Sequence, residues 1–329
     1  ATVRTVTIPA GYAAAATSVT IGNATAVAGG SSLTLSAANA SLTTSGNFTI
    51  NRPSNNTTNL LNVGAGTVSI GGNVTLAGTN TTTTRVNRID ISTGTLNITG
   101  NLVFITGSAA GNLMNITGAG TVNLGNALTA TGEALSPGTT GIFNDNGSVA
   151  QVVRRVSNIF YNHLHLNNSN AAGATLSAAV AATNVTGNIR VQSGIFNNGG
   201  FAIVGGAGDT FEIANGARFN LTGTSAMPSA FSTYTLGPTS TTSFQGGNQT
   251  VAAVSVTSAV PITYGHVIAQ GGSTKTAGAA TPPAALNIAG DFSIENATTF
   301  TANTSDPIIN VTGNMAINGT GIYQSSNNA

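Results

Sequence analysis

The chain has 329 residues, of which 5% are charged and 40% are apolar, and its formal net charge is +1. A typical soluble domain carries about 25% charged residues, so Thr, Ser, Asn and Gly must supply most of the polar surface. Nucleic acid is not an expected partner, because binding phosphates requires a basic surface. The sequence contains no cysteine, which excludes disulfides and thiolate metal sites. The apolar content is sufficient for a buried core.

The sequence begins at Ala1 without a methionine, and it shows no apolar run of membrane-spanning length. We therefore expect a mature, exported chain from which a signal peptide has been removed. The expected location is outside the cell or on its surface, without membrane insertion.

Short stretches that alternate apolar and polar residues follow one another from the start of the chain. Val3–Ile8, Ser18–Ile21, Ser32–Leu35 and Gly46–Ile50 are the first four. Alternation with a period of two, interrupted by Gly and Asn, predicts short β-strands. No window of ten or more residues has a convincing helical period.

A Gly-Asn pair placed between two such strands recurs through the next part of the chain, most clearly in Gly94–Phe104. Such pairs begin at Gly46, Gly72, Gly100 and Gly125, and their spacing is nearly constant. Repeats of this size indicate a solenoid, a propeller or an array, and a propeller blade needs about 40–45 residues. We predict an all-β fold, a right-handed β-solenoid (parallel β-helix) with coils of roughly 23–28 residues.

Six pairs are expected to form corners of the coils, where Gly and Asn would tolerate a positive φ. They are Gly46-Asn47, Gly72-Asn73, Gly100-Asn101, Gly187-Asn188, Gly290-Asp291 and Gly313-Asn314. Around Gly100 we expect Leu96, Ile98, Leu102 and Phe104 to point inward, and Asn97 and Val103 outward. Outward Thr and Asn rows are expected to hydrogen-bond along the stack.

The second half of the chain contains a longer repeat, in which residues of about 143–196 align with residues of about 244–300. The same offset along the sequence aligns Tyr161 with Tyr264 and His163 with His266. We therefore predict a single continuous solenoid over residues 1–329. Its N-terminal coils would occupy residues 1–132, and its C-terminal coils, with an internal duplication, residues 133–329.

Two segments within this repeat carry a resemblance to a known group of proteins. Phe160–Asn168 and Thr263–Ile268, the latter followed by Gly271–Thr276 and the strand after Gly290-Asp291, resemble β-strand-repeat exoproteins of Bacteroidetes-like bacteria. The resemblance covers residues 140–320. It implies a secreted surface location and a role in a filament or in adhesion, rather than a particular activity.

The ends of a solenoid expose strand edges with unpaired N–H and C=O groups, and such edges are templates for association. We predict that the chain is its own partner, as the structural subunit of a head-to-tail filament, because a head-to-tail contact that does not close produces a fibre. The residues expected at this joint are Val3, Thr5, Val6 and Ile8 in the first coil and Val311, Met315, Ile317 and Ile322 in the last.

Other functions remain as alternatives. The first is an adhesin or carbohydrate-binding surface protein that contacts glycans or cells. The second is a polysaccharide-active enzyme, with Asp209 and Glu212, or Asp291 and Glu295, as a carboxylate pair. Asp291 also has a structural explanation, because it occupies a corner position where Asn is usual. We expect no enzymatic activity and no cofactor.

His163 and His165 lie close together in one predicted strand, at alternate positions, and so share a face. Such a pair can begin a metal site, but a third ligand is needed and the sequence does not identify one. The second copy keeps His266 but has Ile268 at the place of His165. We therefore interpret both histidines as surface or groove residues.

Overall fold

The computed structural model describes residues 4–22, 29–78, 84–105, 111–131, 134–278, 284–302 and 307–325. Within these ranges the fold is all-β, with 35 strands, and no helix is present that could cross a membrane. The strands stack in parallel to form a β-solenoid of about 12 turns, which confirms the predicted fold class. The chain divides into two compact units, residues 1–164 (unit 1) and residues 165–329 (unit 2).

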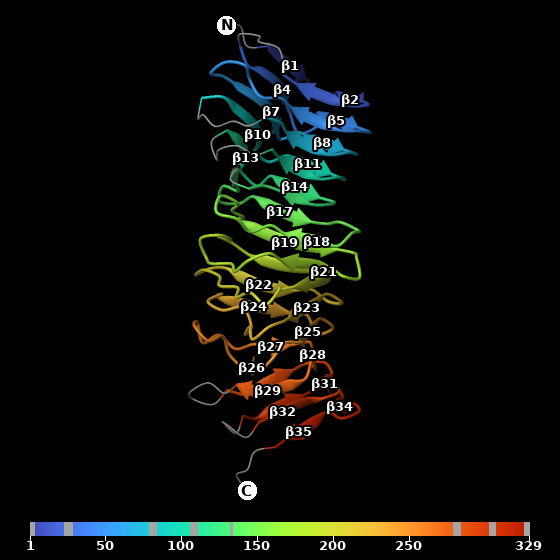
Figure 1. Ribbon diagram of the computed structural model, residues 1–329, viewed down its shortest axis with the longest axis vertical. Helices are drawn as coiled ribbons and strands as arrows, with labels where there is room; N and C mark the ends of the chain where they lie inside the picture. The colour runs from blue at the N-terminus through green and yellow to red at the C-terminus, as the bar shows by residue number, and fades with distance from the viewer. Residues whose placement is uncertain are drawn as a thin grey trace. The chain divides into compact units, whose positions relative to one another are not determined.

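Unit 1 builds its coils on three parallel sheets, named faces A, B and C (Figure 1). Face A contains β1 (Arg4–Ile8), β4 (Ser31–Leu35), β7 (Thr58–Gly64), β10 (Val86–Ile91), β13 (Asn112–Ile116) and β16 (Ala134–Ser136). Face B contains β2 (Ala13–Ala16), β5 (Ser41–Thr44), β8 (Thr67–Ile70), β11 (Thr95–Ile98), β14 (Thr121–Leu124) and β17 (Ile142–Asp145). Face C contains β3 (Val19–Ile21), β6 (Phe48–Ile50), β9 (Val74–Leu76), β12 (Leu102–Phe104) and β15 (Leu128–Thr129). β18 (Gln151–Val153) and β19 (His163–Asn168) follow in the chain.

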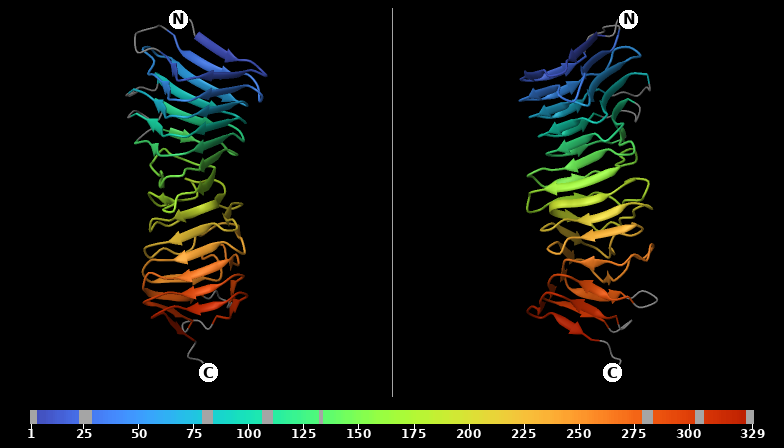
Figure 2. Two further views of the ribbon diagram at one scale, coloured as in Figure 1. Left: turned by 90° about the vertical axis from the view of Figure 1, so that its right-hand side faces the viewer. Right: turned by 180° about the vertical axis from the view of Figure 1, so that it is seen from behind.

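Unit 2 is also made of stacked parallel strands (Figure 2). Its longest stack contains β20 (Ala174–Leu176), β21 (Ile189–Asn197), β23 (Arg218–Leu221), β25 (Thr241–Phe244), β28 (His266–Ala269), β31 (Phe292–Ile294) and β34 (Met315–Ile317). The start of β21 also pairs with β22 (Thr210–Ile213), which pairs with β24 (Thr233–Leu236). The other two stacks are β26 (Gln249–Ala252), β29 (Ser273–Gly278), β32 (Thr298–Thr301) and β35 (Ile322–Gln324), and β27 (Thr263–Tyr264), β30 (Leu286–Ile288) and β33 (Ile309–Val311).

The length of a coil can be measured from residues that face each other in neighbouring coils. Ser69 and Asn97 are separated by 28 positions in the sequence, and Asn287 and Asn310 by 23. The coil between Asn123 and Asn144 spans only 21 positions and is shorter than the predicted range. The strands therefore stay stacked in register, while the number of residues per coil changes with the length of the connecting loops.

Inside and outside alternate along the strands as predicted around the Gly100-Asn101 corner. The side chains of Leu96 and Ile98 on β11, and of Leu102 and Phe104 on β12, are buried. Asn97 and Val103 lie between them and point outward, half-buried. Burial of one such aliphatic side chain stabilises the fold by about 1.5–3 kcal/mol, so a short strand contributes mainly through the column it joins.

The outward asparagines of face B form a ladder along the stack, as expected. The Asn97 amide donates to the Ser69 hydroxyl at 3.1 Å, and the Asn123 amide donates to Asn97 Oδ1 at 2.7 Å. Asn144 continues the series by donating to Asn123 Oδ1 at 3.0 Å. Each amide therefore joins one coil to the next without any charge.

The corners contain the predicted residues, but the predicted reason for glycine was wrong. None of Gly46, Gly72, Gly100, Gly290 and Gly313 has a φ in the left-handed region. Glycine is required by close stacking instead. A Cβ on Gly100 would lie 2.5 Å from Oδ1 of Asn73, the corner asparagine of the preceding coil, and 2.6 Å from the Gly72 carbonyl oxygen.

The corner asparagines act as acceptors for the coil that follows. Asn47 Oδ1 accepts the backbone N–H of Asn73 at 2.8 Å, and Asn73 Oδ1 accepts that of Asn101 at 2.8 Å. In unit 2, Asn188 Oδ1 accepts the Thr210 N–H at 2.9 Å and Asp291 Oδ1 accepts the Asn314 N–H at 2.8 Å. An oxygen at this position, from Asn or Asp, caps the next corner.

A second asparagine ladder lies inside unit 1, at the start of the face A strands. Asn59, Asn87 and Asn112 are buried and occupy paired register positions. The Asn59 amide donates to the Asn51 carbonyl at 2.7 Å, and the Asn87 amide donates to the Ala77 carbonyl at 2.7 Å. These amides thus tie the start of a face A strand to the backbone directly after the preceding face C strand.

The two segments of the proposed duplication contain matching tyrosines. Tyr161 and Tyr264 are both fully buried, and each ring meets a phenylalanine edge to face, Phe143 at 5.2 Å and Phe244 at 6.3 Å between centroids. Each hydroxyl donates to a backbone carbonyl, that of Arg154 at 2.7 Å for Tyr161 and that of Ala252 at 2.8 Å for Tyr264. The duplication itself stays a prediction.

Candidate functional site

The first coil exposes apolar side chains at positions whose equivalents are buried in the inner coils. Val6, Ala14 and Ala16 occupy inward register positions above Leu33, Leu42 and Thr44 of the second coil. With Ile8, Val19 and Ile21 they line a hollow of about 410 Å³, and Val6 is 63% exposed. The alanines of β2 make this hollow, because they are smaller than the side chains stacked beneath them.

The last coil presents large apolar side chains instead. Met315 and Ile317 pair in register with the buried Phe292 and Ile294 of the preceding coil, yet they are 45% and 50% exposed. Tyr323 pairs with Phe300 in the same way and is 36% exposed. Within the described residues, β33, β34 and β35 each pair with one strand only, so their other edges are unpaired.

The eight residues predicted for a subunit joint are therefore distributed as follows. Val6 and Ile8 line the hollow of the first coil, Thr5 points outward and accepts a hydrogen bond from Ser32, and Val3 lies outside the described residues. Val311, Met315 and Ile317 occupy inward positions of the last coil, and Ile322 is exposed opposite the outward Thr299. The inward residue of β35 is Tyr323, which the sequence reasoning missed.

Charge is divided unequally between the two units. Unit 1 contains six arginines and three acidic residues, a formal charge of +3. Unit 2 contains three basic and five acidic residues, a formal charge of −2, and the two values sum to the +1 of the chain. Arg4 belongs to the first coil, and Asp291 and Glu295 flank β31, one coil before the last. The two terminal coils therefore lie near charges of opposite sign.

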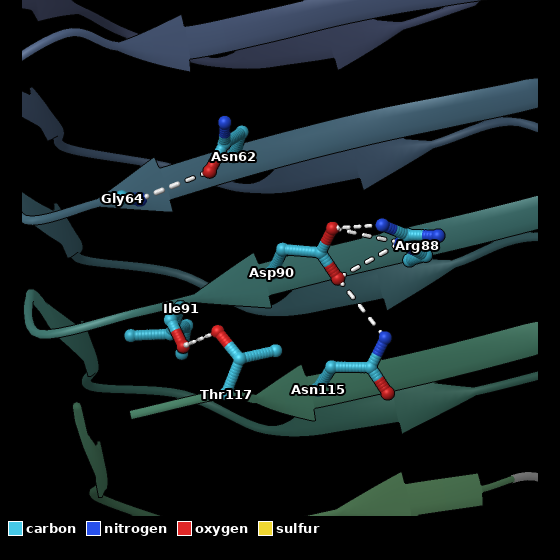
Figure 3. A network of polar contacts seen from close by, with 7 residues as sticks. All are labelled: Asn62, Gly64, Arg88, Asp90, Ile91, Asn115 and Thr117. Atoms are coloured by element: carbon cyan, nitrogen blue, oxygen red, sulfur yellow. Dashed lines mark hydrogen bonds and ion pairs between the residues drawn. The ribbon is translucent and has the colours of Figure 1, made fainter. Parts of the chain in front are cut away.

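A polar network crosses the outer surface of face A (Figure 3). The Arg88 guanidinium binds Asp90, with Nε 2.8 Å from both carboxylate oxygens. Asn115 of the next coil donates to Asp90 Oδ1 at 3.1 Å, and Asn62 Oδ1 accepts the Gly64 N–H on the preceding coil. The network joins β10 to β13 and neutralises the Arg88 charge, so its role is structural.

The candidate metal residues lie on the outward face of β19. His163 and His165 are both half-buried, and they alternate with the buried Leu164 and Leu166. The described residues contain no group of three or more His, Cys, Asp or Glu side chains that could hold a metal ion. His266 serves a corner instead, because its Nδ1 accepts the Asp291 N–H at 2.8 Å.

The candidate carboxylates are engaged separately. Asp209 is buried and accepts the Gly206 N–H at 2.9 Å, whereas Glu212 points outward and forms an ion pair with Arg190 at 3.1 Å. Asp291 caps the Asn314 corner, and Glu295 accepts from the Asn318 amide at 3.0 Å. Each carboxylate thus has an identifiable partner in the fold.

Unit 2 also contains a buried lysine that the sequence reasoning did not single out. Lys275 lies in an inward row of β29, between Gln249 and Phe300 of the neighbouring coils. Its ammonium donates to the carbonyls of Gly246, Gly247 and Gly272 at 2.6, 2.7 and 3.0 Å. Burial lowers the pKa of Lys275 to about 8. The three carbonyls use all three donors, which makes Lys275 an internal clamp on two glycine-rich corners.

Asp145 is the corresponding buried acid of unit 1. It ends β17 at an inward position, and burial raises the pKa of its carboxyl to about 8. Burial also raises the pKa of the neighbouring Tyr161, and the Asp145 charge adds to this rise. A carboxyl with this pKa carries its proton at neutral pH, so Asp145 is accommodated in the core as a neutral group.

Comparisons with protein-family models, with curated proteins and with solved structures gave no match to this chain. The interior asparagine ladder could have been found from the sequence, because Asn59, Asn87 and Asn112 recur at nearly the same interval as the corners. No repeat of this kind marks Lys275 in the sequence. Alternation alone does not explain why a charged residue stands at an inward position.

Proposed function

We propose that the chain is an extracellular structural subunit, without catalytic activity, that assembles head to tail through its terminal coils. The observation that carries this proposal is a pair of inward surfaces that no further described strand covers, small side chains around a hollow in the first coil and large ones on the last. A second copy would place Met315, Ile317 and Tyr323 against the hollow formed by Val6, Ala14 and their neighbours. The exported location rests on the family resemblance of the sequence.

Backbone and charge support the same contact. The unpaired edges of the terminal strands can extend a parallel ladder into another copy, as in recognition by β-augmentation. The formal charges of +3 on unit 1 and −2 on unit 2 favour contact between the first coil of one copy and the last coil of another over contact between two first coils or two last coils. The contact would then join unlike ends of two copies, so that each added copy extends an open filament instead of closing a dimer.

The test is assembly of the purified chain, followed by sedimentation velocity over a concentration series and by negative-stain microscopy. Met315→Lys places a charge on the last coil, and Ala14→Phe fills the hollow of the first. Both are expected to abolish assembly while leaving the thermal unfolding midpoint close to that of the wild type, because no described residue covers either position from the outer side.

Val152→Lys is the matched control. Val152 is 50% exposed on β18, so the change removes an exposed apolar side chain and adds the same charge away from both terminal coils. Assembly should persist in this variant. Single subunits of wild-type chain at high concentration, or equal loss of assembly in Val152→Lys and Met315→Lys, would overturn the proposal.

A further inference from the structure

Two arginines of unit 1 line a cavity whose described lining residues include no acidic side chain. Arg52 and Arg85 come from the face C to face A loops of consecutive coils, and the cavity between them measures about 460 Å³. The remaining described lining residues are Asn51, Pro53, Ser54, Ala77 and Gly78. A volume of about 300–1,000 Å³ is typical of small-ligand sites.

The Arg52 side chain is held in place by its surroundings. Its stem crosses Gly78, where an added Cβ would lie 2.6 Å from Arg52 Cβ, and the φ of Gly78 is +104°. The Arg52 Nε is buried and has no hydrogen-bond partner among the described residues. A buried guanidinium N–H without an acceptor costs free energy, which a bound acceptor would recover.

Both arginine-bearing loops are anchored from inside. The Asn59 amide holds the Asn51 carbonyl, next to Arg52, and the Asn87 amide holds the Ala77 carbonyl at the base of the next loop. These two hydrogen bonds hold the backbone at Asn51 and Ala77, and they do not involve the arginine guanidiniums. Preorganisation of this kind distinguishes a site from a pair of freely moving surface side chains.

A smaller cavity of about 70 Å³ adjoins the first and shares Pro53 and Ser54 with it. Arg4 and Asn59 also line it, which brings in the first coil. Arg4 starts β1, whereas Arg52 precedes β7, and β4 stacks between these two strands. Arg88, which follows Arg85 closely in the chain, differs because Asp90 binds it.

We propose that this arginine cleft binds an acidic polysaccharide through its carboxylate or sulfate groups. The planar guanidinium matches both oxyanions in a bidentate geometry. Arg52 and Arg85 present this group from two consecutive coils. The inference goes beyond the proposed assembly, because Arg52 and Arg85 lie neither in the hollow of the first coil nor in the last coil.

The experiment measures binding of polygalacturonate, dextran sulfate, neutral dextran and inorganic sulfate by isothermal titration calorimetry at low ionic strength. Arg52→Gln and Arg85→Gln are each expected to weaken binding of at least one acidic polymer by about tenfold or more. Arg88→Gln, which removes the same charge nearby, is expected to change it by less than about twofold. Gly78→Val, which displaces the Arg52 stem, should resemble Arg52→Gln.

The outcomes separate the possibilities. Binding of polygalacturonate alone, or of dextran sulfate alone, supports the proposal and identifies the oxyanion. Equal loss in Arg88→Gln, equal binding of neutral dextran, or binding of inorganic sulfate without either polymer overturns it. Repeating the titrations on Met315→Lys keeps the result independent of assembly, so failure of the cleft and failure of the filament are distinguishable.

Discussion

The protonated Asp145 makes the stability of unit 1 depend on pH in a direction that can be calculated. Burial raises the pKa of this carboxyl from 3.8 to about 8. Between these values the native chain binds a proton that the unfolded chain releases, so stability decreases as pH rises from about 4 to 8. A pH of 7 lies about 3 units above the pKa of this carboxyl in the unfolded chain. At about 1.4 kcal/mol per unit, the need to keep Asp145 protonated lowers the stability of the native state at pH 7 by up to about 4 kcal/mol.

Asp145→Asn removes the ionisable group while keeping its size. The variant is expected to be more stable than the wild type by up to about 4 kcal/mol at pH 7 and to equal it near pH 3.5. Guanidinium denaturation at several pH values between 3.5 and 8 measures the difference. Asp209→Asn provides a contrast, because Asp209 accepts the Gly206 N–H and a carboxylate accepts more strongly than an amide, so that change should lower stability. A constant difference between Asp145→Asn and wild type across this range would refute the reasoning.

Five further substitutions test the internal contacts by denaturant unfolding. Lys275→Met leaves three carbonyls without their donor and is expected to cost at least about 2 kcal/mol. Because the pKa of Lys275 is lowered to about 8, wild-type stability should rise between pH 8 and 10.5, and Lys275→Met should not show this rise. Gly100→Ala should cost roughly 1–3 kcal/mol through backbone contact, whereas Gly216→Ala, with a φ of +75° and open space around it, should cost about 1 kcal/mol. A cost below about 1 kcal/mol for Gly100→Ala would contradict close stacking as the reason for glycine at this corner. Tyr161→Phe and Tyr264→Phe should each lose about 1 kcal/mol, and a loss in one alone would contradict the matching of their environments.

The stacking of coils was predictable from the sequence because the strands signal both faces. Around Gly100, alternation correctly placed Leu96 and Phe104 inside and Asn97 outside. The spacing of Gly-Asn pairs indicated the period, since each corner asparagine must meet the corner of the next coil. A local pattern of this kind repeats along the chain because every coil packs on an equivalent one.

Interior polar groups were not predictable by the same reasoning. Alternation assigns a residue to a face but does not show whether carbonyls at a corner can accept from an inward Lys275. The reason for glycine at the corners was also missed, because the distance between Gly100 and Asn73 depends on how closely two coils stack. The arginine cleft could not be predicted, because Arg52 and Arg85 lie outside the strands, where alternation assigns no face.

The parallel register has a consequence for how the chain reaches its fold. Contacts between neighbouring coils join residues that are close in the sequence, as in the pairs Asn123 with Asn144 and Ser69 with Asn97. For a chain of 329 residues, this corresponds to a relative contact order of roughly 0.08, in the range of helical bundles rather than of β-sandwiches. Each completed coil also presents a corner oxygen, such as that of Asn73, to the N–H that arrives next. The chain can therefore fold progressively, one coil at a time, with every coil serving as the template for its successor.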